Sequence, residues 1–335
     1  MRFLSFVLIS LAGSSTILLA SDAIKASQDL LLKGDYAQAE ASLRDALKTG
    51  EADAPDRAAI LNNLGDLLRE EDRTAEARPC FESVLGLRDV PWIQRFSALM
   101  GLADLDRQDR SWTESVGFWN QAMAIAASHD ARILESFAMR GLGVTWLDQG
   151  NTARAEPLLK RALATTESDA GVPSHRLAVA LDSLASLYRA EDKRSMAEEL
   201  WTRELEIDRA TLGDNHPQTA LVMGHLAEAW SMDGDSERAR RYSSQATGIM
   251  RRHFQANSVA VASALVNEAM VEQRAKQLDA AAARYAQALQ ILRTTTGSDE
   301  GAALVARLYA AVLAQLHRGR EAKQVISEVT AFRSK

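Results

Sequence analysis

The most regular feature of this chain is a small residue that is followed four positions later by a large one. The pair recurs eight times, and successive small residues lie 38 to 42 positions apart. A period of this length is typical of proteins built from one repeated supersecondary unit. The pattern therefore predicts eight structural repeats. The eight pairs are Ala39/Leu43, Ala77/Phe81, Ser115/Trp119, Ala155/Leu159, Ala197/Trp201, Ala239/Ser243, Ala281/Tyr285 and Ala322/Ile326.

A second pattern precedes most of these pairs. It consists of an apolar residue, a Leu three positions later, a small residue directly after that Leu, and a large residue three further on. It occurs at 61–68, 139–146, 181–188 and 223–230. These spacings place the side chains on one stripe of a helix. Each repeat is thus predicted to hold a first helix (the A helix), a turn and a second helix (the B helix), with small residues where the two cross closely.

Prolines and glycines fall where these helices are expected to begin and end. Prolines that precede A helices lose little, because the first turn has no partner for the missing N–H, and prolines early in B helices remove few bonds. The former are Pro55, Pro91, Pro173 and Pro217, and the latter are Pro79 and Pro157. Turn glycines followed by N-cap side chains lie between A and B at Gly34-Asp35, Gly150-Asn151 and Gly234-Asp235. The predicted fold class is all-α, an α-solenoid of about eight helical hairpins.

These residues resemble the tetratricopeptide repeat family, whose repeats combine Leu-Gly or Leu-Ala, a large residue three later, and Ala-x3-aromatic. The 42-residue spacing in the middle of the chain and the linker Leu-Gly-Asp-Asn-His-Pro at 212–217 resemble its kinesin-light-chain-like subtype. The resemblance covers residues 21–335, with repeats starting near 20, 58, 96, 136, 178, 220, 262 and 303. It implies a right-handed superhelix. Asp106 and Ser243 depart from the pattern at large positions, and the eighth repeat is blurred.

The first twenty residues have the pattern of a targeting signal. Arg2 precedes an apolar run at 3–12, and a second short apolar stretch ends at Ala20. Residues 1–20 are therefore predicted to be a signal peptide, which directs export to the periplasm or the medium. The alternative is an uncleaved membrane anchor formed by residues 3–20, a length at the short end of what spans a bilayer.

Charge and side-chain chemistry argue against several classes of function. The chain has 39 Lys and Arg against 45 Asp and Glu, a net charge of −6, which is too mild to favour nucleic acid or an anionic membrane. Its single cysteine, Cys80, has no partner for a disulfide or a zinc site. The six histidines form no metal motif, and no phosphate-binding or nucleophile motif occurs. We expect no catalytic residue, metal, cofactor or small-molecule substrate, and therefore no enzyme.

The resemblance implies instead a surface, because A helices line the concave side of such a stack. Arginine there offers forked donors for carboxylates and carbonyls, and Asn62 offers a donor and an acceptor for a peptide backbone. An alternative for Asp66/Arg69 and Asp104/Arg107, spaced i,i+3, is that they only pair with each other. The candidate peptide- or protein-binding residues are Asn62, Asp66, Arg69, Met100, Asp104, Arg107, Arg140, Asp182, Ser186 and Arg189, and His225 continues this face.

The sequence therefore predicts a non-catalytic scaffold or adaptor that binds an extended peptide or protein surface in its concave groove. The alternative is a structural protein that assembles into a homo-oligomer through its C-terminal end. Val325, Ile326, Val329 and Phe332 are apolar, and no further helix is expected to cover them. Light scattering discriminates between the two, because an adaptor stays monomeric without its ligand.

Overall fold

The computed structural model describes residues 24–27, 29–30, 35–49, 52–169, 175–295 and 299–332. Segment 1–20, on which the export prediction depends, lies outside the described residues, as do Gly34, Pro173 and the side chains of Val329 and Phe332. The described residues form helices joined by turns and contain no strand, which confirms the all-α prediction. The chain divides into an N-terminal unit, Arg2–Asp169, and a C-terminal unit, Ala170–Lys335.

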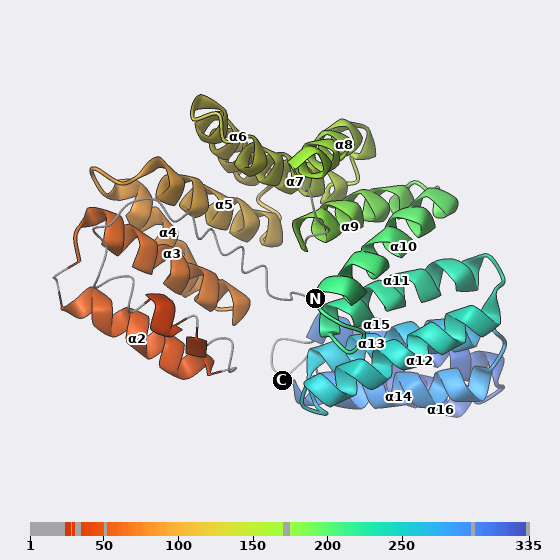
Figure 1. The fold of residues 1–335 in the computed structure, drawn as a ribbon. Helices are drawn as coiled ribbons and strands as arrows, with labels where there is room; N and C mark the ends of the chain where they lie inside the picture. The colour runs from red at the N-terminus through yellow and green to blue at the C-terminus, as the bar shows by residue number, and fades with distance from the viewer. Residues whose placement is uncertain are drawn as a thin grey trace. The chain divides into compact units, whose positions relative to one another are not determined.

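The N-terminal unit holds the helices of the first four repeats (Figure 1). In this unit each helix packs against the next along the chain. Consecutive A helices also touch, α3 with α5 and α5 with α7. The A helices are α3 (Ala54–Glu70), α5 (Trp92–Gln108) and α7 (Arg132–Asp148), and the B helices are α2 (Tyr36–Lys48), α4 (Thr74–Gly86), α6 (Trp112–Ser128) and α8 (Thr152–Asp169).

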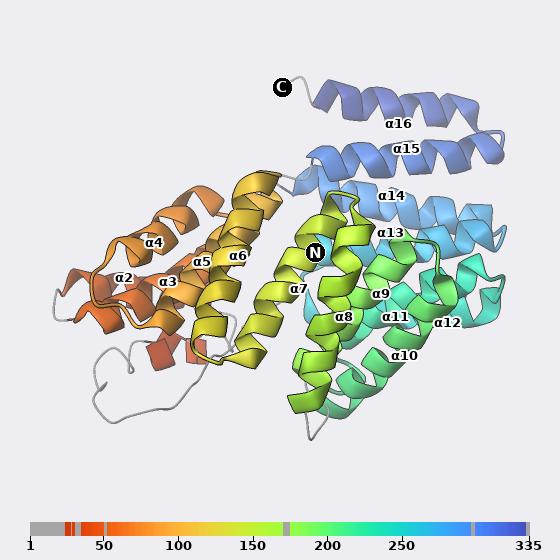
Figure 2. The same cartoon turned by 90° about the horizontal axis from the view of Figure 1, so that it is seen from above.

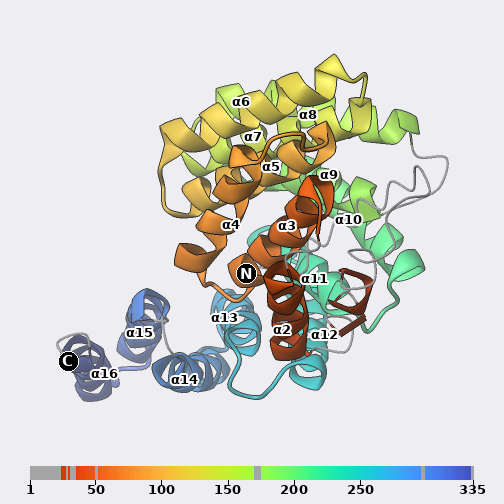
Figure 3. The same ribbon diagram turned by 90° about the vertical axis from the view of Figure 1, so that its left-hand side faces the viewer.

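The C-terminal unit holds four complete hairpins. Figure 2 shows α13 to α16 as successive rows, and Figure 3 shows that α13 and α15 form one layer while α14 and α16 form the other. The A helices are α9 (His175–Ala190), α11 (Pro217–Met232), α13 (Val259–Arg274) and α15 (Asp299–Gln315), and the B helices are α10 (Arg194–Thr211), α12 (Ser236–His253), α14 (Leu278–Thr294) and α16 (Gly319–Phe332).

Large B-helix side chains occupy the space left by small A-helix residues. The Phe81 ring is fully buried, and a Cβ added at Gly65 or Gly101 would lie 2.8 or 2.5 Å from its atoms. Trp119 fills the corresponding space at Gly141, where an added Cβ would lie 2.4 Å from the indole. Such distances are well inside contact range, so these glycines are packing residues, as predicted. The Phe81 ring therefore lies against two consecutive A helices, α3 and α5.

The last repeat is the exception to this packing. Seven of the eight large residues of the pairs are buried, but Ile326 on α16 remains 37% exposed, and Leu304 on α15 is 51% exposed. No further hairpin of the described chain covers this end. The last repeat therefore keeps the pattern of a small residue followed by a large one, although its large residue, Ile326, is not buried.

Turn chemistry follows the sequence. Asp35, Asn151 and Asp235 accept hydrogen bonds from backbone N–H groups three residues later, as predicted for N-caps. Gly150 and Gly234 have φ of 76° and 88°, the left-handed conformation that favours glycine. Other turns between A and B helices place a non-glycine residue in the same conformation, which the sequence did not indicate. These residues are Asp72, Arg110, Asp192, Lys276 and His317.

Candidate binding face of the A helices

Charged side chains of alternating sign connect the A helices of the N-terminal unit. Arg69 Nη2 lies 3.2 Å from Asp66 Oδ1 on α3, and Arg69 Nη1 lies 3.9 Å from Asp104 Oδ2 on α5. Arg107 continues the series with 3.3 Å to Asp104 Oδ1 and 2.7 Å to Asp148 Oδ2 on α7. We call Asp66, Arg69, Asp104, Arg107 and Asp148 the charge ladder. The i,i+3 pairing considered from sequence is thus present, and contacts between repeats extend it.

The far end of the ladder opens into a pocket of about 740 Å³. Arg107 and Asp148 line it together with Arg110, Trp112 and two glutamines from the C-terminal ends of α5 and α7. The left-handed turn at Arg110 and the start of α6 at Trp112 place an exposed guanidinium and a half-buried indole at its edge. Sequence reasoning missed these two residues, because they belong to the turn rather than to the A helix.

The environment of the ladder is partly withdrawn from water. The Asp66 side chain keeps 44% of its exposure, yet burial raises its pKa above the ordinary value, and Arg69 opposes part of this shift. The Asp66 carboxyl is thus reached by water and is also surrounded by protein, as expected for a group in a hollow of the surface. On the same helix, burial raises the pKa of Glu70 to about 7, again opposed by Arg69. Charge interactions here are therefore stronger than on an open surface.

Asn62 does not fit the role expected for it. Only 4% of the residue is exposed, and its Nδ2 donates to the backbone oxygen of Gln94 at 3.0 Å and to Gln94 Oε1 at 2.8 Å. Both amide hydrogens are thus used between α3 and α5, so the prediction of a two-sided clamp on a peptide backbone is wrong in its donor half. Met100 and Arg140, two further predicted residues, lie half-buried on α5 and α7.

The predicted residues of α9 belong to the other unit and have different surroundings. Asp182 Oδ1 accepts a 3.1 Å hydrogen bond from Trp201 Nε1 and lies 3.4 Å from His225 Nδ1 on α11. Ser186 is half-buried and Arg189 is exposed. Trp201 itself is 1% exposed, and its ring centroid lies 5.1 Å from that of His225. This confirms that Trp201 is wedged between its own hairpin and the next.

Beneath Asp182 lie two carboxyl groups that the sequence did not single out. Glu204 and Asp208, one turn apart on α10, are both fully buried, and neither Asp208 carboxyl oxygen has a hydrogen-bond partner among the described residues, whereas Gln218 lies near the Glu204 carboxyl. Burial raises the pKa of Glu204 well above its ordinary value, and the charge of Asp182 adds to the shift. For the same two reasons the pKa of Asp208 rises to about 6. The spacing i,i+4 was visible in the sequence, but burial was not.

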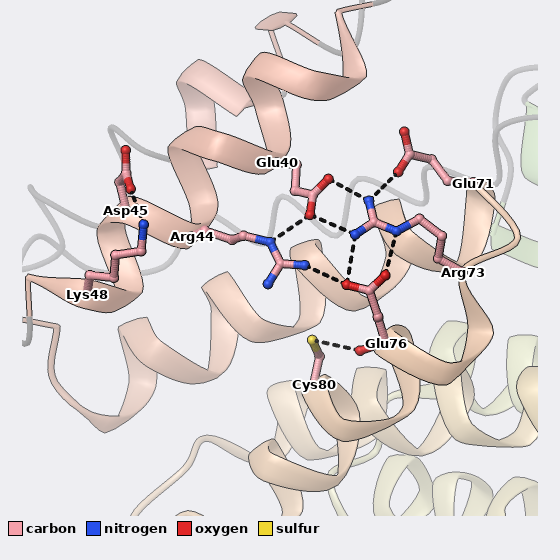
Figure 4. Close-up of polar contacts among 8 residues, drawn as sticks. All are labelled: Glu40, Arg44, Asp45, Lys48, Glu71, Arg73, Glu76 and Cys80. Carbon is pink, nitrogen blue, oxygen red and sulfur yellow. Dashed lines mark hydrogen bonds and ion pairs between the residues drawn. The ribbon is translucent and has the colours of Figure 1, made fainter.

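A separate network on the first two B helices is already saturated (Figure 4). Arg73 contacts Glu40 at 2.6 Å, Glu71 at 2.9 Å and Glu76 at 2.8 Å, and Arg44 joins Glu40 to Glu76 at 2.6 and 3.0 Å. Hydrogen bonding to Arg73 lowers the pKa of Glu40 below its ordinary value, against the effect of burial. The network ties α2 to α4.

Among the described residues, no group of three or more His, Cys, Asp or Glu side chains is arranged to hold a metal ion. No described helix is both long and apolar enough to cross a membrane.

Comparison with known families accounts for the repeat. A model described as tetratricopeptide repeat matches residues 20–89 and 176–252, and a second model with that description matches 138–174. The chain is a tetratricopeptide repeat protein. The matched segments include the Phe81 and Trp201 positions around which the hairpins of this tetratricopeptide repeat array pack.

Solved structures share the fold of this tetratricopeptide repeat protein. BtubC (BKLC) from P. vanneervenii is 20% identical with a TM-score of 0.56, over 68% of this chain and 91% of that one. A Rap protein complexed with Competence and Sporulation Factor is 11% identical with a TM-score of 0.60, over 94% and 97%. Aspartyl phosphate phosphatase F from Bacillus subtilis is 12% identical with a TM-score of 0.60, over 97% of both chains. At these identities the likeness shows the fold alone. No curated protein sequence matches the chain.

Proposed function

We propose that this protein is a non-catalytic adaptor that binds an extended peptide or a protein surface along the A-helix face of its N-terminal unit. The charge ladder and the pocket at its end carry the proposal. They bring donors and acceptors from three consecutive repeats into one line that opens into a cavity of about 740 Å³. A protein of similar fold, the Rap protein, is found in complex with Competence and Sporulation Factor, which supports binding as the role of the array.

Without a ligand, the charged groups of the ladder are paired with one another, so none of them is left without a partner. Arg69 is 13% and Arg107 is 26% exposed at the side chain, and each already contacts carboxylates of neighbouring helices. A ligand carboxylate or carbonyl exchanges with these internal acceptors, and a ligand cation exchanges with the arginines at Asp66 or Asp148. A ligand must break internal ion pairs in order to bind, so each new contact adds only a modest binding free energy. A ligand with the same alternation of charges binds best, because it replaces every broken pair.

Substitution of one ladder arginine, Arg107, together with Arg140 on α7 tests the proposal. A partner captured from the native host and identified by mass spectrometry is titrated by calorimetry against the wild-type chain and against Arg107→Ala with Arg140→Ala. We expect the double variant to weaken binding by about 2 kcal/mol or more, roughly thirtyfold, with the helical circular dichroism unchanged.

The matched control removes two arginines from α12. Arg238 is unsuitable, because it contacts Asp235 at 3.1 Å and its guanidinium lies 4.9 Å from the centre of the Trp230 ring. Arg240 and Arg241 are exposed on the same helix, so Arg240→Ala with Arg241→Ala should change the affinity little. If this control weakens binding and the ladder variant does not, the binding face lies elsewhere.

A second candidate is self-association through the C-terminal end. Exposure of Leu304 and Ile326 on the last hairpin favours it. Light scattering over a hundredfold range of concentration separates the two functions: a constant monomeric mass supports the adaptor, and a rising mass that Leu304→Glu abolishes supports assembly.

We also propose export, with residues 1–20 as the signal. The support is the sequence pattern of Arg2 followed by an apolar run.

A further inference from the structure

The C-terminal unit has a groove on its B-helix side that the proposed function does not use. It lies between α10 and α12, with α11 beneath, and encloses about 570 Å³. We call it the α10–α12 groove. Its lining includes Arg209, Asp214, Met223, Gly248, Ile249 and Arg252.

The floor of the α10–α12 groove is apolar and open. Met223 and Ile249 contribute to it, and both are buried, with 3% exposure each. Gly248 supplies no side chain, and a Cβ built there would meet only Arg252 Nη1, at an ordinary contact distance of 3.5 Å. Gly248 lies inside helix α12, where glycine is unfavourable for helix formation. Its effect is to keep space free above the two apolar residues.

Guanidinium groups stand on both sides of this floor. Arg209 comes from α10, and its Nε lies 2.9 Å from Asp214, a carboxylate whose side chain is 75% exposed. Arg252 comes from α12 and donates to Asn215 Oδ1 at 2.8 Å. Each guanidinium has five N–H donors, so one contact leaves several for a ligand. The interactions with Asp214 and Asn215 position the two guanidinium groups at the linker and leave other N–H donors of each group available.

Among the charged side chains that line the groove, the arginines Arg209 and Arg252 outnumber the single carboxylate of Asp214, although the net charge of the whole chain is −6. The last turn of α12 carries Arg251, Arg252 and His253. Burial, and to a lesser extent the neighbouring His253, lower the pKa of His216 in the linker. An acidic ligand is therefore attracted to this end of α12.

The corresponding groove between α14 and α16 has different chemistry. It encloses about 430 Å³ above α15 and is lined by Glu321 and Glu328 as well as Arg293. Arg293 Nη2 already lies 2.9 Å from Glu328. The cleft between neighbouring B helices thus recurs, whereas the two arginines over an apolar floor belong to the α10–α12 groove.

We propose that the α10–α12 groove binds an extended acidic segment of a partner protein. Carboxylates of the segment contact Arg209 and Arg252, and an apolar side chain between them lies over Gly248 on Met223 and Ile249. The bidentate geometry of guanidinium and carboxylate gives the contact its direction, and the apolar side chain gives it area. This site is independent of the charge ladder, so one chain presents two binding faces.

The test uses the full chain and fluorescein-labelled decapeptides read by fluorescence anisotropy. One peptide alternates Glu and Leu, and its matched control alternates Gln and Leu. We expect the Glu peptide to bind and the Gln peptide to bind at least tenfold more weakly, with the difference shrinking as salt is raised from roughly 50 to 300 mM, because screening of the charges strengthens over this range.

Variants locate the contact. Gly248→Leu fills the floor, and we expect it to weaken binding of the Glu peptide at least fivefold, whereas Gly248→Ala improves helix propensity without filling the groove and leaves binding nearly unchanged. Arg209→Ala with Arg252→Ala should have an effect at least as large as that of Gly248→Leu. Unchanged thermal unfolding of each variant shows that the fold is retained.

The failure of this proposal is distinguishable from that of the adaptor function. If the Glu peptide does not bind, or if Gly248→Leu binds it as well as Gly248→Ala does, the α10–α12 groove is not the site. If Arg107→Ala with Arg140→Ala abolishes binding instead, acidic segments use the charge ladder. That outcome overturns the groove and supports the adaptor face.

Discussion

Asp208 provides a quantitative test of the interior of the C-terminal unit. Its carboxyl is fully buried on α10 beside Glu204 and below Asp182. Burial, together with the charge of Asp182, raises its pKa from 3.8 to about 6. A shift of about 2 units corresponds to about 3 kcal/mol, at about 1.4 kcal/mol per unit. This is the cost of keeping the ionised group in the folded chain at pH 8.

The direction of the pH dependence follows from the raised pKa. The folded state binds the proton more tightly than the unfolded state, so the contribution of Asp208 to stability is fully present below pH 3.8 and is lost as the pH rises through about 6. The raised pKa of Glu204 acts in the same direction. We therefore expect the unit to be more stable at pH 5 than at pH 8.

The perturbation is Asp208→Asn, which keeps the shape and removes the ionisation. We expect a gain of up to about 3 kcal/mol at pH 8 and a much smaller change at pH 4. Glu206→Gln is the matched control, because Glu206 is exposed on the same helix between the two buried acids. Since repeat arrays unfold in parts, hydrogen exchange of α9 to α11 at pH 5 and pH 8, corrected for intrinsic rates, is the assay.

Two results would refute this reasoning. The first is equal protection of α9 to α11 in Asp208→Asn and Glu206→Gln at pH 8, which means that the buried carboxyl costs nothing. The second is a wild-type chain whose protection in these helices does not increase from pH 8 to pH 5.

Three further outcomes are expected. Trp201→Ala removes a buried indole and the donor to Asp182, and should cost about 3–5 kcal/mol, measured as lost exchange protection around the fifth repeat; a cost below about 1 kcal/mol contradicts the packing. Arg78→Ala leaves Asp106, whose side chain is 4% exposed, without its 2.5 Å partner, and should lower the urea midpoint by the equivalent of about 1.5–3 kcal/mol, whereas Asp106→Asn should cost less because Arg78 reaches water. Export predicts that amino-terminal sequencing of the mature protein starts near residue 21, and an intact Met1 on membrane-bound protein supports the anchor instead.

The repeat could be predicted from the sequence, because most hairpins pack a large B-helix side chain against small A-helix residues and therefore need the same residue spacing. Gly65, Phe81 and Gly101 are spaced so that one ring meets two small residues, and a similar spacing recurs in other repeats. The predicted A-helix starts near 58, 96 and 136 fall four residues inside the helices, which begin at 54, 92 and 132. The apolar stripe marks where a helix is buried, whereas its first turn is capped by polar groups and belongs to no stripe.

The face of the A helices was predictable, but the roles of its residues were not. Helical periodicity brings Asp66, Arg69, Asp104 and Arg107 to one side, and the structure shows them joined across repeats. Asn62 has the same periodicity and is nevertheless buried against Gln94, because its exposure depends on how closely the next A helix approaches.

Tertiary structure alone decided the features that depend on several repeats at once. Asp106 departs from the apolar pattern in sequence, and only the position of Arg78 on α4 shows why a carboxylate is tolerated there. Glu204 and Asp208 look like solvent-facing acids of a helix until α9 and α11 cover them. A one-dimensional pattern records which face of a helix is apolar, but the burial of a charge and the opening of a groove are set by the distance between helices, which the sequence spacing does not encode.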